Sequence, residues 1–188
     1  MSQITKRALE AALKQQLLTK PLTKITVSDI TDACGINRMT FYYHFKDIYD
    51  LVEWCCEEDA RAALAGKKTH DTWQQGLLQI FHAVQENKPF IMNVYHCVSR
   101  ERVEQFLYPQ VYHLVRGVVD EEAKTHPVAE SEKEFIANFY KYGFVGLMLE
   151  WIQGGMRADP EELVGTLSLL LSGSMEAAMI RYASHQTP

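Results

Sequence analysis

The sequence predicts an all-α protein, with a small N-terminal unit of three helices followed by a larger helical bundle. Apolar residues recur at the three- and four-residue spacing of amphipathic helices along most of the chain, and strand-like alternation is nearly absent. Gly, Pro and capping residues separate the helical stretches. The 188 residues are enough for a small domain joined to a larger one.

The first predicted helix covers residues from about 4 to 18. Its apolar stripe includes Leu9 and Leu13, while charged residues such as Lys6 face away from that stripe. Pro21 stops the helix, because proline lacks the amide proton that a helix interior needs.

Two short helices follow, separated by a tight turn. Thr26 and Asp29 have the spacing of a capping box, which predicts the start of the second helix. Gly35 is expected to end it in a left-handed conformation. Asn37 then caps a third helix that starts at Arg38. Two helices joined in this way match the helix-turn-helix plan.

The rest of the chain predicts longer helices. They cover about 47–64 and 71–87, a helix that begins near Phe90 and carries Tyr95, His96 and Cys97, a stretch to about 124 that Pro109 kinks or splits, and residues 131–153 and 159–183. Residues 66–69 form a break between the two helical sets. Ser131 and Glu134 have capping-box spacing, and Asp159 followed by Pro160 is a strong helix start.

The net charge of −5 conceals a strong asymmetry. Residues 1–46 carry seven basic and three acidic side chains, a net of +4, and the remaining 142 residues carry 12 basic and 21 acidic ones, a net of −9. A phosphate backbone would attract the first segment and repel the second. The charge pattern therefore permits a nucleic-acid-binding N-terminal unit.

The sequence predicts a cytoplasmic protein. Its four cysteines form no CxxC pair, which favours reduced thiols. The N-terminus shows no signal-peptide pattern. The most apolar stretches are interrupted by Glu150 and Glu176, so we expect them to fall well short of a membrane span.

The third helix has an unusual composition for a structural helix. Phe41 and Phe45 lie four residues apart and are expected to face inward. The other side chains are rich in hydrogen-bond donors that suit phosphate oxygens and base edges: Arg38, Thr40, Tyr42, Tyr43, His44 and Lys46. Arg38 has the donors to bind a guanine in the major groove. Taken alone, these aromatic residues would be better explained as surface packing.

The stretch from Thr26 to Leu51 resembles the signature of TetR-type transcriptional regulators. The pattern comprises a Thr-capped helix, a Gly-apolar turn, a Thr-aromatic-Tyr run, an aromatic pair ending in Phe, and Lys-Asp before the next helix. It falls here at Thr26, Gly35, Ile36, Thr40, Phe41, Tyr42, His44, Phe45, Lys46 and Asp47. This register favours DNA contact over simple packing.

The resemblance implies a DNA-binding domain at residues 1–47 and a helical ligand-binding and dimerisation domain at residues 48–188, connected by helix 48–65. The backbone contacts that it implies are Thr40, Tyr42, His44 and Lys46. The base contacts that it implies are Asn37, Arg38 and Met39. Ser28 would touch bases or phosphate, Thr26 would cap its helix and bind phosphate, and Tyr43 is the second tyrosine of the set.

The resemblance also implies a homodimer through helices 131–153 and 159–183. Small residues there would allow close helix approach: Gly143, Gly146, Gly165, Ser168, Ser172, Gly173 and Ala177. The stretch from Tyr140 to Glu162 further resembles a subgroup that includes regulators of dihydroxyacetone kinase operons. In that subgroup the signal is expected from a partner protein rather than from a ligand in a pocket.

The larger domain shows weak candidates for other sites. An apolar ligand pocket could be lined by Trp73, Phe81, Phe90, Tyr95, Tyr112, Phe144 and Trp151, although aromatic residues at helical spacing are more often core. The candidate ligand contacts are Tyr95, His96, Tyr112 and Trp151. His82, His96, Cys97 and His113 lack zinc-site spacing, so no metal or cofactor is expected. No catalytic constellation is apparent, and we do not expect an enzyme.

These observations favour a homodimeric regulator that binds a near-palindromic operator in double-stranded DNA. The expected type is a repressor that a small molecule or a protein signal releases. One alternative is a co-regulator or activator subunit that acts mainly through a partner protein. Another is an all-helical enzyme or carrier, which would need convergent polar side chains in a pocket.

Overall fold

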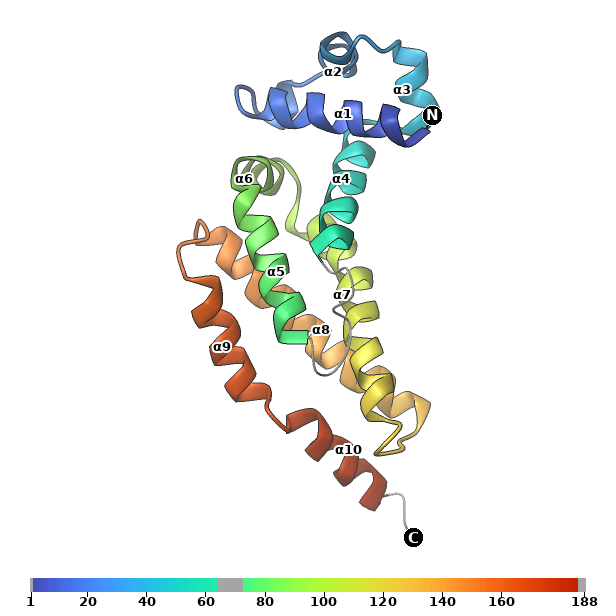
Figure 1. The fold of residues 1–188 in the computed structure, drawn as a ribbon, viewed down its shortest axis with the longest axis vertical. Helices are drawn as coiled ribbons and strands as arrows, with labels where there is room; N and C mark the ends of the chain where they lie inside the picture. The colour runs from blue at the N-terminus through green and yellow to red at the C-terminus, as the bar shows by residue number, and fades with distance from the viewer. Residues whose placement is uncertain (1, 64–72, 186–188) are drawn as a thin grey trace. The chain divides into compact units, whose positions relative to one another are not determined.

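The computed structural model describes residues 2–63 and 73–185, and every regular element in these ranges is helical (Figure 1). The all-α prediction is therefore confirmed. The elements are α1 (Ser2–Leu17), the 3-10 helix η1 (Leu22–Lys24), α2 (Val27–Cys34), α3 (Arg38–His44), α4 (Ile48–Ala63), α5 (Trp73–Glu86), α6 (Lys88–Cys97), α7 (Arg100–Glu122), α8 (Glu130–Gln153), α9 (Pro160–Leu171) and α10 (Ser174–His185). The predicted break at residues 66–69 and the start of a helix at Asp71 lie outside the described residues.

The chain folds into two compact units. The head unit comprises Met1–Ala62 together with Glu86–Arg100, so it contains α1–α4 and α6. The body unit comprises Ala63–Gln85 and Glu101–Pro188, which contribute α5 and α7–α10. The functional boundary between residues 47 and 48 stays a prediction.

The core of the head unit is an apolar cluster around α1. This helix packs against α2 and α3, and the predicted stripe of α1 is buried with Leu9 and Leu13 fully inaccessible. Ile30 of α2, Phe41 of α3 and Leu51 of α4 close the same cluster. Burying each such side chain contributes roughly 1.5–3 kcal/mol, so apolar packing holds α3 in place.

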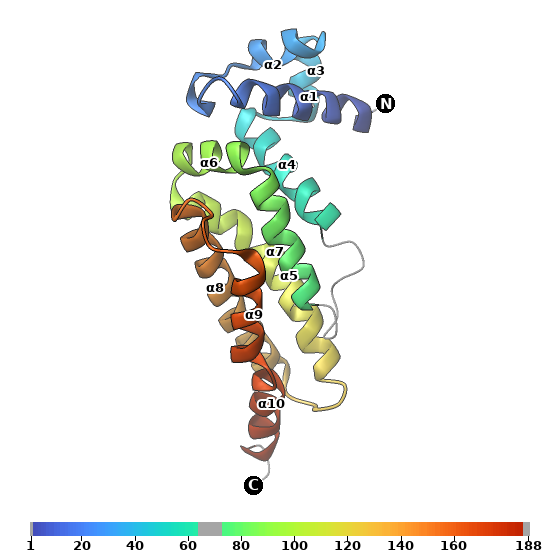
Figure 2. The same cartoon turned by 60° about the vertical axis from the view of Figure 1, so that its left-hand side comes forward.

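Helix α6 belongs to the head unit (Figure 2). Its Phe90 is buried in the apolar cluster of that unit, and its Asn93 bonds to the end of α1. The Asn93 side chain accepts a hydrogen bond from the Leu22 amide at 2.9 Å. It also donates to the carbonyl oxygens of Leu17 at 3.2 Å and Lys20 at 3.3 Å. Asn93 thereby provides hydrogen-bond partners for backbone amide and carbonyl groups at and just after the end of α1, where the helix itself supplies none.

A charged network joins α1 to α4 within the head unit. The buried carboxylate of Glu10 accepts hydrogen bonds from Arg7 and Lys14, each at 2.8 Å. Arg7 and Lys14 also pair with Glu58 at 2.6 Å and Asp59 at 2.9 Å on α4. Burial disfavours the Glu10 carboxylate, but the hydrogen bonds from Lys14 and Arg7 outweigh it and lower its pKa. The network therefore keeps a buried charge paired.

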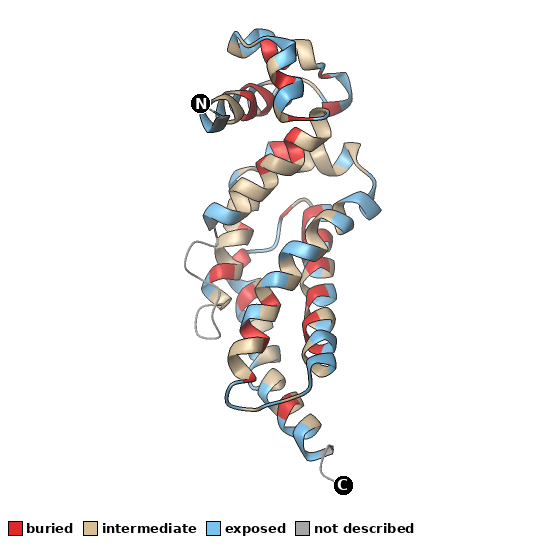
Figure 3. Ribbon diagram, turned by 90° about the vertical axis from the view of Figure 1, so that its right-hand side faces the viewer, coloured by how far each residue is buried: buried red, intermediate tan, exposed pale blue. Residues whose placement is uncertain are grey.

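The body unit has its own apolar cluster (Figure 3). Val119 of α7, Ala137 of α8 and Met179 of α10 are fully buried in it. In the same unit, the rings of Phe81 and Trp151 meet edge to face at 4.9 Å, and the Trp151 indole donates to the Ala158 carbonyl at 2.8 Å.

Three predicted element boundaries differ from the structure. Pro109 does not split its helix, since α7 runs from Arg100 to Glu122. The predicted box of Ser131 and Glu134 is wrong, because the Glu132 carboxylate accepts from the Ala129 amide at 2.8 Å and α8 begins earlier. The single helix predicted for 159–183 is interrupted between α9 and α10 (Figure 1).

The interruption lies at Gly173, whose φ of +67° ends the α9 geometry. That left-handed conformation is costly for residues with a Cβ and accessible to glycine. The stretch Pro160–Ser184 nevertheless has the length and composition of a membrane-crossing helix, with a mean hydropathy of 1.5 in its most apolar window. By length and composition, the expectation that every apolar stretch is too short to cross a membrane is therefore wrong.

Candidate nucleic-acid interface

The turn between α2 and α3 has the predicted geometry. Gly35 adopts φ +66° and its amide donates to the carbonyl oxygens of Asp32 and Thr31. Ile36 then donates to the Thr31 carbonyl at 2.9 Å and packs its half-buried side chain against the core. The Asn37 side chain accepts from the Met39 amide at 2.8 Å, so it caps α3 as expected. These bonds fix the direction in which α3 leaves α2.

The N-terminus of α2 is closed by the predicted capping box. The Thr26 hydroxyl accepts from the Asp29 amide at 3.1 Å and donates to the Asp29 carboxylate at 2.8 Å. That carboxylate also accepts from the Thr26 amide at 2.8 Å and pairs with Lys20 at 3.2 Å. The amide of Thr26, its hydroxyl and Lys20 together lower the pKa of Asp29 to about 2. The Thr26 hydroxyl would have to leave Asp29 before it could donate to a phosphate.

The inner face of α3 is aromatic and buried, as predicted. Phe41 is fully inaccessible and Phe45 is nearly so. The rings of these two residues are 5.9 Å apart, and Phe45 also lies 5.8 Å from Trp54 of α4. Lys6 of α1 places its ammonium 5.2 Å from the Phe45 ring centroid. This packing leaves the opposite side of α3 facing outward.

The outer face of α3 is formed by Met39, Tyr42 and Tyr43. Their spacing of three and four residues places them on one side of the helix. Met39 is 76% exposed, Tyr43 is 84% exposed and Tyr42 is 50% exposed. The Tyr42 ring meets Phe41 edge to face at 5.5 Å. The tyrosine hydroxyl is therefore carried by a ring that the core holds in place.

Charged and polar predicted residues border this face. Arg38 and Lys46 are exposed, and in the described part of the chain neither side chain forms an ion pair. Thr40, His44 and Ser28 are half-buried. The amide of Lys46 donates to the Asp50 carboxylate at 2.8 Å, which fixes the backbone from which the lysine extends.

One further basic residue near the interface was not predicted from the sequence. Lys24 is exposed on η1, two residues before the N-cap of α2. No motif identifies it in the sequence, because it precedes the recognisable pattern that starts at Thr26. Lys24 is the last residue of η1, which lies in the head unit just before α2 in the chain.

The body unit contains an apolar cavity of about 220 Å³. Its lining is mostly aliphatic and aromatic and comes from Trp73, Gly76, Leu77, Ile80, Leu107, Val111, Leu114, Val115, Val118, Tyr140, Phe144, Val145, Met148, Leu171, Gly173, Met175 and Glu176. The polar groups on this lining include Tyr140, whose hydroxyl bonds to Ser174 at 2.7 Å, and the Glu176 carboxylate. An apolar cavity with few polar groups is the usual form of a small-molecule site.

The four ligand candidates selected from the sequence lie away from this cavity lining. Tyr95 and His96 are on α6 in the head unit. Tyr112 contacts Arg116 on its own helix at 3.5 Å. Trp151 is buried against Phe81. Trp73 and Phe144, two of the aromatic residues expected to line a pocket, do line this cavity. The aliphatic residues of the lining come from helices far apart in sequence, and no local pattern marks them.

Helix α8 presents an exposed apolar stripe within the body unit. Phe135, Phe139 and Tyr142 are all more than half exposed. Gly143 and Gly146 lie on the same helical face, and a Cβ built at either would meet nothing within 4 Å. Packing within the chain therefore does not require glycine at these positions. An exposed stripe of this kind marks a contact surface.

Family models match most of the chain. The model described as "Bacterial regulatory proteins, tetR family" matches residues 8–55, and the one described as "Transcriptional regulator C-terminal region" matches residues 71–173. The first covers the turn and α3. The second covers α5 to α9 and ends before α10, which also lines the cavity.

Known proteins show the same likeness. The HTH-type dhaKLM operon transcriptional activator DhaS of Lactococcus lactis subsp. lactis (strain IL1403) is 29% identical over 138 residues, which are 72% of this chain and 73% of that protein. The solved structure of a dihydroxyacetone kinase operon activator DhaS has a TM-score of 0.71 at 24% identity and covers 93% of this chain and 97% of that one. The TetR family repressor AlkX from Dietzia sp. strain DQ12-45-1b has a TM-score of 0.60 at 12% identity, with 93% and 96% covered.

Proposed function

Because this chain belongs to the TetR family of bacterial transcriptional regulators, we propose that it acts as a cytoplasmic homodimer that binds a near-palindromic operator through α3. The observation that carries the proposal is the outward face of α3. A buried aromatic pair orients that face, and unpaired basic side chains border it. Each head would place α3 in a major groove, which is how helix-turn-helix dimers read two half-sites.

The residues divide into two roles under this proposal. Arg38, Asn37 and Met39 meet base edges, because they lie at the N-terminal end of α3 where a recognition helix enters the groove. The backbone contacts are Thr40, Tyr42, Tyr43, His44 and Lys46, with Ser28 and Lys24 at the edge. Thr26 acts first as a helix cap. The modest net charge of +4 on residues 1–46 makes affinity depend on dimer valence as well as on phosphate contacts.

The dimer would form through the exposed stripe of α8 and the apolar surface of α9. Leu169 is 84% exposed and Leu170 is 73% exposed. Their burial against a second copy explains why Pro160–Ser184 is so apolar while only 11% of its most apolar window is buried within one chain. The break at Gly173 divides the stretch into two helices of 12 residues, each shorter than the roughly 20 residues that a membrane span needs. We therefore assign the stretch to a protein contact.

The effector is proposed to act on the body unit. The cavity suits a small, largely apolar molecule, while the likeness to dihydroxyacetone kinase operon regulators favours a partner protein. The 29% identical relative is named an activator, which favours activation over the repression that the sequence predicted. A transcriptional reporter measured with and without a chromosomal deletion of this protein's gene shows whether the protein activates or represses transcription. Pull-down of a stoichiometric partner distinguishes a partner protein from a small-molecule effector.

DNA binding to the upstream region of the protein's own gene tests the proposal. Arg38→Ala is expected to lose about 1–3 kcal/mol and to relax base discrimination. Tyr42→Phe keeps the ring on Phe41 but removes the hydroxyl, so it should weaken binding to all sequences alike. Arg157→Ala, which removes the same charge from an exposed position between α8 and α9, is the control and should bind as wild type.

Wild-type protein that shows no saturable, sequence-dependent binding at low salt would contradict the proposal. The co-regulator that acts through a partner would then become the leading function.

A further inference from the structure

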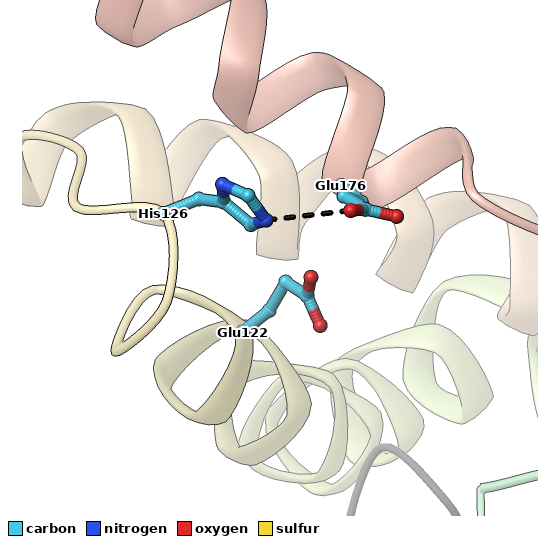
Figure 4. Close-up of side chains that lie close together, drawn as sticks. All are labelled: Glu122, His126 and Glu176. Carbon is cyan, nitrogen blue, oxygen red and sulfur yellow. Dashed lines mark ion pairs between the residues drawn. The ribbon is translucent and has the colours of Figure 1, made fainter.

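We propose that Glu122, His126 and Glu176 form a binding site for a divalent transition-metal ion, with Zn²⁺ as the best-matched ion (Figure 4). One imidazole nitrogen and two carboxylate oxygens, one from each residue, all lie within 4.8 Å of one another. The site departs from the expectation that the chain holds no metal. It goes beyond the proposed DNA-binding function and does not depend on it.

The backbone brings two of the ligands together at the end of α7. Glu122 is the last residue of that helix. The His126 amide donates to the Glu122 carbonyl at 3.1 Å, so the chain completes one more helical turn. Residues four apart on such a turn share one face. Glu122 and His126 therefore point toward the same space, as Figure 4 shows.

The third ligand is fixed by the packing of α10. Glu176 lies in the first turn of that helix. Met179, three residues later, is fully buried against α7 and α8 in the body-unit cluster. Ser174 at the start of α10 bonds to Tyr140 of α8 at 2.7 Å. These contacts, which involve neither ligand, hold the part of α10 that carries Glu176 opposite His126.

The observed spacing is close to the spacing of coordinated ligands. The His126 Nε2 and Glu176 Oε1 atoms are 3.4 Å apart. Two ligand atoms that each lie about 2.0–2.2 Å from a tetrahedral Zn²⁺ are separated by roughly 3.3–3.6 Å. A ligand oxygen of the half-buried Glu122 lies within 4.8 Å of both atoms.

The donor set selects the class of ion. Imidazole nitrogen favours zinc and neighbouring transition metals over Mg²⁺ and Ca²⁺, which prefer oxygen alone. Three protein ligands leave a fourth position for water or another donor. Glu176 also lines the apolar cavity, so the ion would lie at the edge of that cavity.

An ordinary ion pair explains less of the arrangement. A pair needs only His126 and Glu176, whereas here a second carboxylate approaches the same imidazole. In the part of the chain that the structure describes, Glu176 pairs with no lysine or arginine. A divalent cation would neutralise both carboxylates and require a neutral imidazole.

The test is Zn²⁺ binding to the untagged, full-length protein without DNA, measured by calorimetry after treatment with a chelator. We expect saturable binding of one Zn²⁺ per chain, and Co²⁺ in its place should give the visible absorption of a tetrahedral site. His126→Ala and Glu176→Gln should each weaken Zn²⁺ binding at least tenfold, and Glu122→Gln should weaken it in the same direction.

His82→Ala is the matched control, because His82 also pairs with a glutamate, Glu161, at 3.1 Å. It should retain wild-type affinity for Zn²⁺. Equal losses in His82→Ala and His126→Ala, or the absence of saturable binding, would overturn the proposal. Unchanged helical circular dichroism of the metal-free variants separates lost ligands from lost folding, and Glu122→Gln supplies a conservative variant if His126→Ala unfolds.

Discussion

At the scale of single residues, a few polar side chains determine where the interface lies. Asp29 and Thr26 start α2, Asn37 starts α3, and Asn93 ties α6 to the end of α1. The caps have local sequence signatures and were predicted from them. Asn93 has none, because its partners lie more than 70 residues away in the chain.

Replacing Asn93 with Ala should destabilise the head unit by about 1–3 kcal/mol, because the Leu22 amide and two carbonyl groups lose their partner. Chemical denaturation measures the change. Gln105→Ala is the control, since the exposed Gln105 side chain donates to the Glu101 carboxylate of its own helix at 3.4 Å. Equal effects of the two substitutions would show that Asn93 does not hold α6 to α1.

The depressed pKa of Asp29 predicts a dependence of stability on pH. Its folded-state pKa is about 2, below the unfolded value of about 4. The stabilisation is therefore fully present above about pH 4 and is lost as pH falls toward 2. The difference in unfolding free energy between wild type and Asp29→Asn should be constant near neutrality and shrink in this acidic window.

The exposed Asp32→Asn variant, three residues along α2, serves as the reference for Asp29→Asn. If the difference in unfolding free energy between wild type and Asp29→Asn stays unchanged down to pH 2, the charged capping box does not have the stabilising role proposed for it.

At the scale of elements, the short helices of the head were more predictable than the long helices of the body. Gly35 needs a positive φ and Phe41 needs burial, and both demands are visible in a few neighbouring residues. The end of α9 at Gly173 was missed because apolar residues continue on both sides of it. Most of the cavity lining was not predicted, because α5, α7, α8 and α10 each supply only part of it.

The exposed glycines of α8 provide an element-scale prediction. Gly146→Leu adds a side chain where nothing lies within 4 Å in the same chain, so the fold should keep or gain stability. If a second copy packs on this face, the same side chain prevents close helix approach. We expect a weakened dimer in analytical ultracentrifugation with an unchanged circular dichroism spectrum.

Gln153→Leu, at the exposed end of the same helix, controls for added apolar surface. A Gly146→Leu protein that dimerises as tightly as wild type would place the dimer contact on another surface.

At the scale of the whole molecule, the chain links a cavity-bearing body unit to a head unit whose first 46 residues are net basic. Helix α5 contributes to the cavity lining and continues in sequence through Asn87 into α6, which Asn93 attaches to α1. An effector that changes the position of α5 would therefore act on an element of the head through a continuous stretch of chain. Such an effector shifts the balance between DNA-competent and incompetent states only if it binds one of them more tightly.

Footprinting of wild-type protein on its upstream DNA tests most directly whether two copies of α3 read two half-sites. We expect two protected patches on one face of the duplex, separated by about 10–10.5 base pairs or a multiple of that spacing. Saturable binding with a single protected patch, or with uniform protection and no periodicity, would contradict it.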